Sequence, residues 1–162
     1  MTPAELLALL DEFYRDTLQL AESRQVNARS VKEYSANNAY QQVLGRQDIH
    51  LQWLSDAIVG LGGGLPPAGQ SQENAATVPN ASEQSLLDAD VAGQRAAIDR
   101  WAPRIQEVTN ARHRKMLELI LGEMKEHHRV LQQAADGRTD LLGRHPDGKV
   151  LRGEVMAARP KN

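Results

Sequence analysis

Four stretches of this sequence repeat apolar residues at intervals of three and four, the spacing of one face of an α-helix. The most regular stretch begins near Ser30 and ends sharply at Gly62-Gly63-Gly64 and Pro66-Pro67. Its expected inner face consists of Tyr40, Leu44, Gln47, Leu51, Leu54, Ile58 and Leu61. A helix with one apolar stripe has to pack that stripe against other elements, so the pattern predicts an all-α fold of packed helices.

The first helix is expected to begin at the N-terminus of the chain. Thr2-Pro3-Ala4-Glu5 combines an N-cap threonine, a proline at the first helical position and a glutamate three residues after the cap. Its stripe continues to about Ser23 and consists of Leu6, Leu10, Phe13, Thr17 and Leu20.

The second half of the sequence predicts two more helices. Asn80 and Glu83 mark the start of one, and Pro103 predicts a kink or an early end. Its stripe is Leu87, Val91, Gln94, Ile98, Trp101 and Ile105. The other follows a turn at Thr109-Asn110 and ends at Asp136-Gly137, with His113, Leu117, Ile120, Met124, His127 and Leu131 on one face.

Residues 65–80 are rich in Pro, Gly, Ser, Asn and Gln and predict a loop. The loop is long enough to travel the length of a bundle, so we expect an antiparallel four-helix bundle with a long crossover between its second and third helices. This domain is expected over residues 1–137. Residues 138–162 are expected to form an irregular tail, with a short helix over 150–158 as the weaker alternative.

Composition narrows the possible partners. The formal net charge of −2 argues against a general nucleic-acid binder, which needs clustered positive charge. The chain has no cysteine, which excludes disulfides and thiolate metal sites. No apolar stretch approaches the ~20 residues that span a bilayer, and the N-terminus begins a helix instead of a signal sequence. We therefore expect no membrane partner and a cytoplasmic location.

Two segments resemble the ferritin-like superfamily. Residues 50–63, HLQWLSDAIVGLGG, are similar to the end of that family's second helix, and residues 120–127, ILGEMKEH, to the end of its fourth. The resemblance covers roughly residues 4–135. It implies the four-helix fold and a homodimer that packs through its first two helices. It also implies a dinuclear metal site with one glutamate on each of two helices and Glu-x-x-His on each of the others.

The metal-ligand positions of the family fall on residues that are mostly neutral in this chain. The two Glu-x-x-His motifs correspond to Gln47-x-x-His50 and Met124-x-x-His127, and the third-helix glutamate corresponds to Gln94. The first-helix glutamate falls on Thr17, with Glu12 or Asp16 as the alternative. Both histidines are present and none of the four carboxylates is. Because neutral groups do not offset the charge of two buried ions, we expect no ordinary di-iron centre.

Three hypotheses about function follow. The favoured one is a non-catalytic binding or structural protein without a cofactor, acting through itself or a partner. The second is a single metal ion (zinc, iron or manganese) held by His50 and His127, with Glu12, Asp16 or Glu123 turned inward. The third is a bundle that binds a small molecule in an internal cavity. A 24-subunit cage is less expected, because no clear fifth helix is visible.

Overall fold

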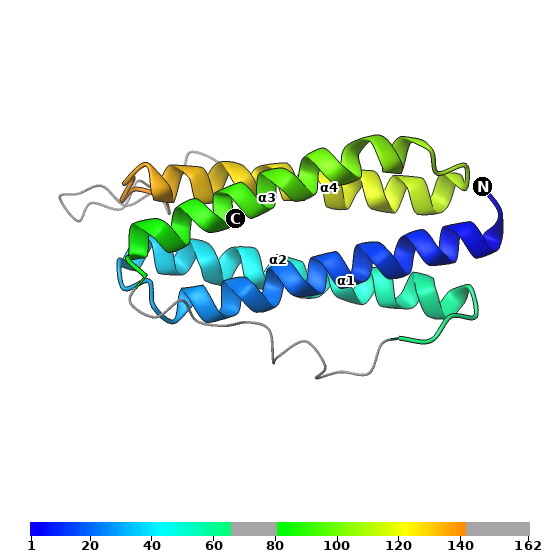
Figure 1. The fold of residues 1–162 in the computed structure, drawn as a ribbon, viewed down its shortest axis with the longest axis horizontal. Helices are drawn as coiled ribbons and strands as arrows, with labels where there is room; N and C mark the ends of the chain where they lie inside the picture. Colours follow the sequence, from blue (N-terminus) through cyan, green and yellow to red (C-terminus); the bar gives the residue numbers. More distant parts are fainter. Residues whose placement is uncertain (66–80, 142–162) are drawn as a thin grey trace, which may run out of the picture.

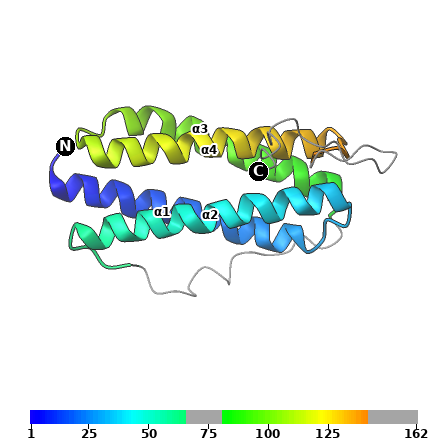
Figure 2. The same cartoon turned by 180° about the vertical axis from the view of Figure 1, so that it is seen from behind.

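The computed structural model describes residues 1–65 and 81–141, in which four helices lie side by side (Figure 1). They are α1 (Pro3–Ala28), α2 (Tyr34–Gly60), α3 (Glu83–Gln106) and α4 (Ala111–Ala135). The strongest packing joins α1 to α2 and α3 to α4, while α2 also contacts α4 and α1 contacts α3 (Figure 2). The described ranges contain no strand. The expected all-α fold of packed helices is therefore confirmed.

The start of α1 follows the predicted capping pattern. The Thr2 hydroxyl accepts a hydrogen bond from the backbone N–H of Glu5 at 3.2 Å, and the Glu5 carboxylate accepts one from the backbone N–H of Thr2 at 2.6 Å. The helix ends at Ala28, five residues beyond the expected end at Ser23. It continues because Ala21, Arg24 and Ala28 extend the buried stripe; Leu20 is only partly buried.

The expected start of α2 near Ser30 is wrong by four residues, since the helix begins at Tyr34. The Glu33 carboxylate caps it by accepting from the backbone N–H of Ala36 at 2.6 Å. The Asn37 amide donates to the carbonyls of Ala28 and Val31, which holds the chain between α1 and α2 in a turn. At its other end α2 stops at Gly60, and Gly62 takes a positive φ of 81°, as the predicted glycine stop requires.

Pro103 does not end α3 early, because the helix runs from its Ser82 N-cap to Gln106. The proline removes the hydrogen bond to the carbonyl four residues earlier, at Asp99. Both Asp99 and Pro103 are exposed, so water can reach that carbonyl. The turn before α4 is confirmed: Asn110 caps the helix by accepting from the backbone N–H of His113 at 3.1 Å.

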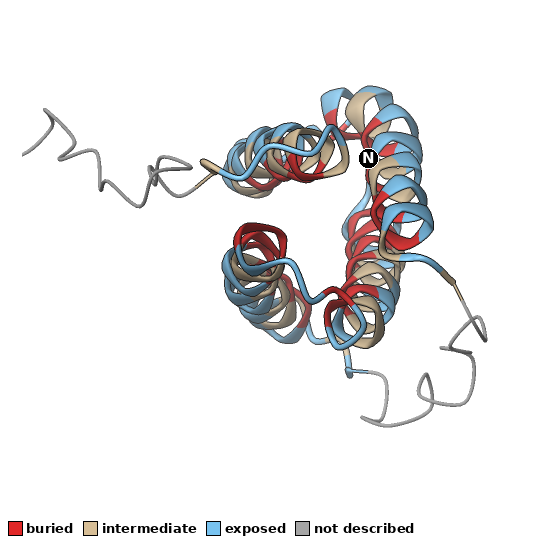
Figure 3. Ribbon diagram, turned by 90° about the vertical axis from the view of Figure 1, so that its left-hand side faces the viewer, coloured by how far each residue is buried: buried red, intermediate tan, exposed pale blue. Residues whose placement is uncertain are grey.

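Buried residues face the interior of the bundle (Figure 3) and form two apolar clusters. The larger includes Leu6, Leu10, Phe13, Leu54, Ile58, Ile98, Trp101, Ile105, Leu117 and Ile120. The smaller includes Ala28, Val31, Ala36, Tyr40, Leu87, Leu131 and Ala134. On every helix the residues between these clusters include buried polar side chains, so a polar layer divides the core.

Among the described helices none is both long and apolar enough to span a membrane. The C-terminal tail beyond residue 141, with its alternative helix over 150–158, lies outside the described residues, and so does the loop segment 66–80. The predictions for those segments remain predictions.

Candidate functional site

The buried polar side chains between the two apolar clusters form what we call the central polar layer. Its members come from all four helices and are Thr17, Arg24, Gln47, His50, Asp90, Gln94 and His127, each at most 6% exposed. Buried polar groups are costly unless they are hydrogen-bonded. The pairing of these groups therefore decides what the layer can do.

Arg24 is the most deeply buried charge of the layer, with no exposed surface. Its Nη2 donates to Oε1 of Gln94, and Nε2 of Gln94 donates in turn to the carbonyl of Met124 at 2.8 Å. Nε and Nη1 of Arg24 have no hydrogen-bond partner. Burial lowers the pKa of Arg24, while the negative charge of Asp90 raises it.

Asp90 is held in place by two donors from the first half of the chain. Its Oδ2 accepts from the Tyr40 hydroxyl at 2.6 Å and from Nδ2 of Asn27 at 2.8 Å. Burial and the charge of Asp90 raise the pKa of Tyr40, so the phenol remains a donor at neutral pH. The buried carboxylate of Asp90 and the buried guanidinium of Arg24 thus belong to one layer and are linked by their opposite charges.

His50 contacts a carboxylate at the edge of the layer. Its Nε2 lies 2.7 Å from Oε2 of Glu123, which also accepts from Nε of Arg46 at 2.9 Å. Burial lowers the pKa of His50, and the hydrogen bond to Glu123 raises it. The hydrogen bond from Arg46 lowers the pKa of Glu123. The charge of Glu123 is therefore already matched by Arg46.

His127 lies against His50, with ring centroids 5.7 Å apart and an interplanar angle of 27°. Burial, followed by the charges of His50 and Arg24, lowers the pKa of His127 to about 4. The ring is neutral at physiological pH. Its Nδ1 and the Oε1 of Gln47 have no hydrogen-bond partner.

Four of the six family-equivalent residues are buried members of the layer: Gln47, His50, Gln94 and His127. Of these, His50 and His127 have rings that lie against each other. Thr17 is buried too, but its hydroxyl donates back to the carbonyl of Phe13 at 2.8 Å. Met124 packs its side chain in the larger apolar cluster and offers the layer only its backbone carbonyl.

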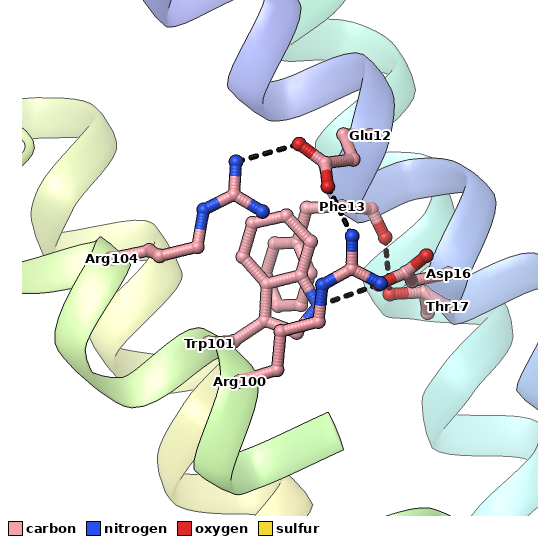
Figure 4. A network of polar contacts seen from close by, with 7 residues as sticks. All are labelled: Glu12, Phe13, Asp16, Thr17, Arg100, Trp101 and Arg104. Atoms are coloured by element: carbon pink, nitrogen blue, oxygen red, sulfur yellow. Dashed lines mark hydrogen bonds and ion pairs between the residues drawn. The ribbon is translucent and has the colours of Figure 1, made fainter. Parts of the chain in front are cut away.

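The two alternative first-helix carboxylates lie elsewhere, in a cluster between α1 and α3 (Figure 4). Glu12 binds Arg100 and Arg104, and these arginines lower the pKa of Glu12 to about 2. Asp16 accepts from Nε1 of Trp101 at 2.9 Å and pairs with Arg100 at 2.8 Å. Arginines bind both carboxylates, so the cluster joins two helices. Neither Glu12 nor Asp16 is therefore available to the central polar layer.

Comparisons with models of protein families, with curated proteins and with solved structures gave no match. We therefore infer the function from the geometry of the layer and from the surface of the bundle.

The residues of the layer do not fit a dinuclear metal centre. In residues 1–65 and 81–141, no three His, Cys, Asp or Glu side chains gather closely enough to hold a metal ion. Hard cations need carboxylates that supply negative charge. Here the carboxylate positions hold two amides, a threonine and a methionine, Glu123 is bound by Arg46, and Arg24 adds a buried positive charge.

Sequence reasoning missed Arg24, Asp90 and Tyr40 as partners. A signal was present for Arg24, because Thr17, Ala21, Arg24 and Ala28 continue the helical spacing of the stripe. The pairing of Asp90 with Tyr40 had no comparable signal, since 50 residues separate them in the chain.

Proposed function

We propose that the protein is a ferritin-like, antiparallel four-helix bundle that acts as a non-catalytic binding or structural protein. Two features support this topology. The end of α2 and the start of α3 lie at opposite ends of the bundle in Figures 1 and 2, which is the placement that a long crossover needs. The residues at four family-equivalent positions are also buried in the central polar layer.

The observation that carries the non-catalytic proposal is the hydrogen bonding of Gln94. Its Oε1 accepts from Arg24, and its Nε2 donates to the carbonyl of Met124. At this position the family has a glutamate that binds metal. In this chain both ends of the side chain are used to join three helices, which is the role of a structural residue.

We further propose that the partner is a second copy of the chain, docked on the outer face of α1 and α2. A groove of about 1080 Å³ runs along these helices. Leu18, Leu44 and Leu51 line it and are partly buried. The acidic Glu22 and Asp48 and the basic Arg29 also line it, so a two-fold arrangement can pair opposite charges between the copies.

A single metal ion is the second candidate function. The unpartnered Nδ1 of His127 and Oε1 of Gln47 favour it, because both atoms can act as ligands and His50 lies beside them. The positive charge of Arg24, which lowers the pKa of His127, argues against it.

Metal analysis separates the two functions. The untagged protein is loaded with Fe(II), Mn(II) or Zn(II), desalted and analysed by mass spectrometry for bound metal. The non-catalytic proposal expects far less than one ion per chain. Near-stoichiometric metal that disappears in a His50→Ala, His127→Ala double variant would overturn it and establish the single-ion function.

The dimer is tested with a pair of glycine variants. Gly45 lines the groove, and a Cβ added there meets nothing within 4 Å in the monomer. Gly45→Arg should therefore leave the bundle folded and shift the mass measured by light scattering from dimer to monomer. Gly122→Arg is the matched control, since Gly122 on α4 is equally open and lies outside the groove. A wild-type monomer at every concentration, or a Gly45→Arg dimer, would overturn the proposed interface.

A further inference from the structure

We propose that the guanidinium of Arg24 is the built-in cation of the central polar layer and takes the place of the metal ions that carboxylates at these positions would hold. The inference rests on the proposed ferritin-like arrangement. The inference explains why the side chains at the family-equivalent positions are neutral: the Arg24 side chain supplies the positive charge that metal ions would otherwise bring.

The contacts of Arg24 place its charge at the family-equivalent positions. The guanidinium donates directly to Gln94, the third-helix position. Its charge also acts on His127, the fourth-helix histidine, whose pKa it helps to lower. A side chain from α1 thus touches or influences residues of two other helices in the layer, as an interior metal ion would.

With a single guanidinium as the cation, amides balance the charge of the layer better than four carboxylates would. Two divalent ions carry four positive charges, which four carboxylates can offset. Arg24 carries one, and one further buried carboxylate, Asp90, raises its pKa through its negative charge. Replacing carboxylates by Gln47 and Gln94 keeps hydrogen-bond acceptors in the layer without adding negative charge. The replacement of carboxylates by amides and the replacement of metal ions by Arg24 therefore both lower the charge of the layer, and the two changes match.

The balance of charges in the layer also predicts that Arg24 and a metal ion exclude each other. The charge of Glu123 is paired with Arg46, and the charge of Asp90 already acts on Arg24. A divalent ion in the layer would add two positive charges beside a buried guanidinium with no carboxylate left to offset them. Restoring carboxylates alone should consequently not restore metal binding, because Arg24 would pair with them.

The test starts from a variant with two restored carboxylates, Gln47→Glu and Gln94→Glu, at positions whose side chains lie in the layer. Mn(II) binding is measured by electron paramagnetic resonance in this background, with and without Arg24→Met. We expect removal of Arg24 to tighten Mn(II) binding at least about tenfold. Arg15→Met in the same background is the matched control, because Arg15 lies on the same helix with an exposed side chain outside the groove, and it should leave the affinity unchanged. Equal affinity with and without Arg24 would overturn the inference.

A second measurement decides the question if the carboxylate variants do not fold. Arg24→Met, Asp90→Asn and the double variant are made in the wild-type chain, and their urea unfolding midpoints are compared. We expect each single change to lower the midpoint and the double change to lower it by less than the sum, since each charge offsets the other. Additive losses would overturn the role of Arg24 as a cation matched within the layer.

Failure of the proposed function would look different from failure of this inference. Wild-type protein that itself binds stoichiometric metal, with Arg24 intact, would contradict the non-catalytic proposal directly. A different result is tight Mn(II) binding by the carboxylate variant with Arg24 intact and none by the wild-type protein. It would leave the non-catalytic proposal standing and would show that Arg24 is not the replacement cation.

Discussion

Nε2 of His50 lies 2.7 Å from a carboxylate oxygen of Glu123. An ionised carboxylate only accepts hydrogen bonds, so the proton of the neutral imidazole is on Nε2. This bond fixes the orientation of the His50 ring. The same ring lies against the ring of His127. Because Arg46 binds the same carboxylate, the group that orients His50 carries no unmatched charge.

The burial of His127 should make the protein sensitive to mild acid. Its pKa is about 4 in the folded state against 6.5 without the fold, so the unfolded chain binds more protons between these values. The contribution of His127 to the free energy of unfolding is complete above pH 6.5 and falls as the pH drops toward 4. The expected loss between pH 7.5 and pH 4.5 is about 2.5 kcal/mol.

Urea unfolding at the two pH values measures this loss. His127→Gln should reduce the pH dependence by about that amount, because glutamine does not titrate. His128→Gln is the control, since His128 adjoins His127 on α4 but is not among the buried polar residues. An unchanged pH dependence in the His127 variant would contradict the prediction.

Tyr40→Phe should lower the free energy of unfolding by about 2 kcal/mol, because it removes a donor from the buried carboxylate of Asp90. Chemical unfolding at pH 7 measures the change. Tyr14→Phe provides the comparison: Tyr14 is partly buried against the larger apolar cluster, and its change should cost less than ~0.5 kcal/mol. Equal losses would mean that the Tyr40 hydroxyl contributes no special stability.

Much of the fold could be predicted because its signals are local. The capping residues Thr2 and Glu5 and the glycines after α2 act within a few positions of one another, and the structure confirms them. The start of α2 was misplaced because Asn37 ties down a turn by bonding to carbonyls of Ala28 and Val31. A pattern of apolar residues carries no information about such a bond.

The site was predictable only in part for the same reason. Helical spacing placed His50 and His127 on inner faces, and both are buried. A charged residue is expected at the surface unless it has partners. The partner of Arg24 is Gln94, which lies 70 residues further along the chain. Burial of that arginine is a property of the assembled bundle.

The two tryptophans should respond differently to replacement by phenylalanine. Trp101 is fully buried and donates from Nε1 to Asp16 at 2.9 Å, and Arg104 lies over its ring at 4.3 Å (Figure 4). Trp101→Phe should cost about 2 kcal/mol through lost volume and the lost bond. Trp53→Phe should cost less than ~1 kcal/mol, because Trp53 is only partly buried. Unfolding curves that rank the two variants in the opposite order would contradict this assignment.

The glycines at the end of α2 give a last prediction. A Cβ on Gly63 would lie 2.6 Å from Cδ1 of Leu7, 2.8 Å from Cγ2 of Ile58 and 3.1 Å from the carbonyl oxygen of Ile58. The Leu7 methyl can move, but Ile58 is fully buried and its carbonyl accepts from the backbone N–H of Gly63 at 2.9 Å. Gly63→Ala should therefore destabilise the protein by about 1–3 kcal/mol.

Gly60 provides the matched control for Gly63. It is the last residue of α2, and a Cβ there meets nothing within 4 Å. Since alanine favours helix over glycine, Gly60→Ala should be neutral or raise the free energy of unfolding by up to ~1 kcal/mol. Opposite signs for the two variants would show that close packing against Ile58 selects glycine at residue 63. A similar loss in both would instead mean that the whole glycine stop needs backbone freedom.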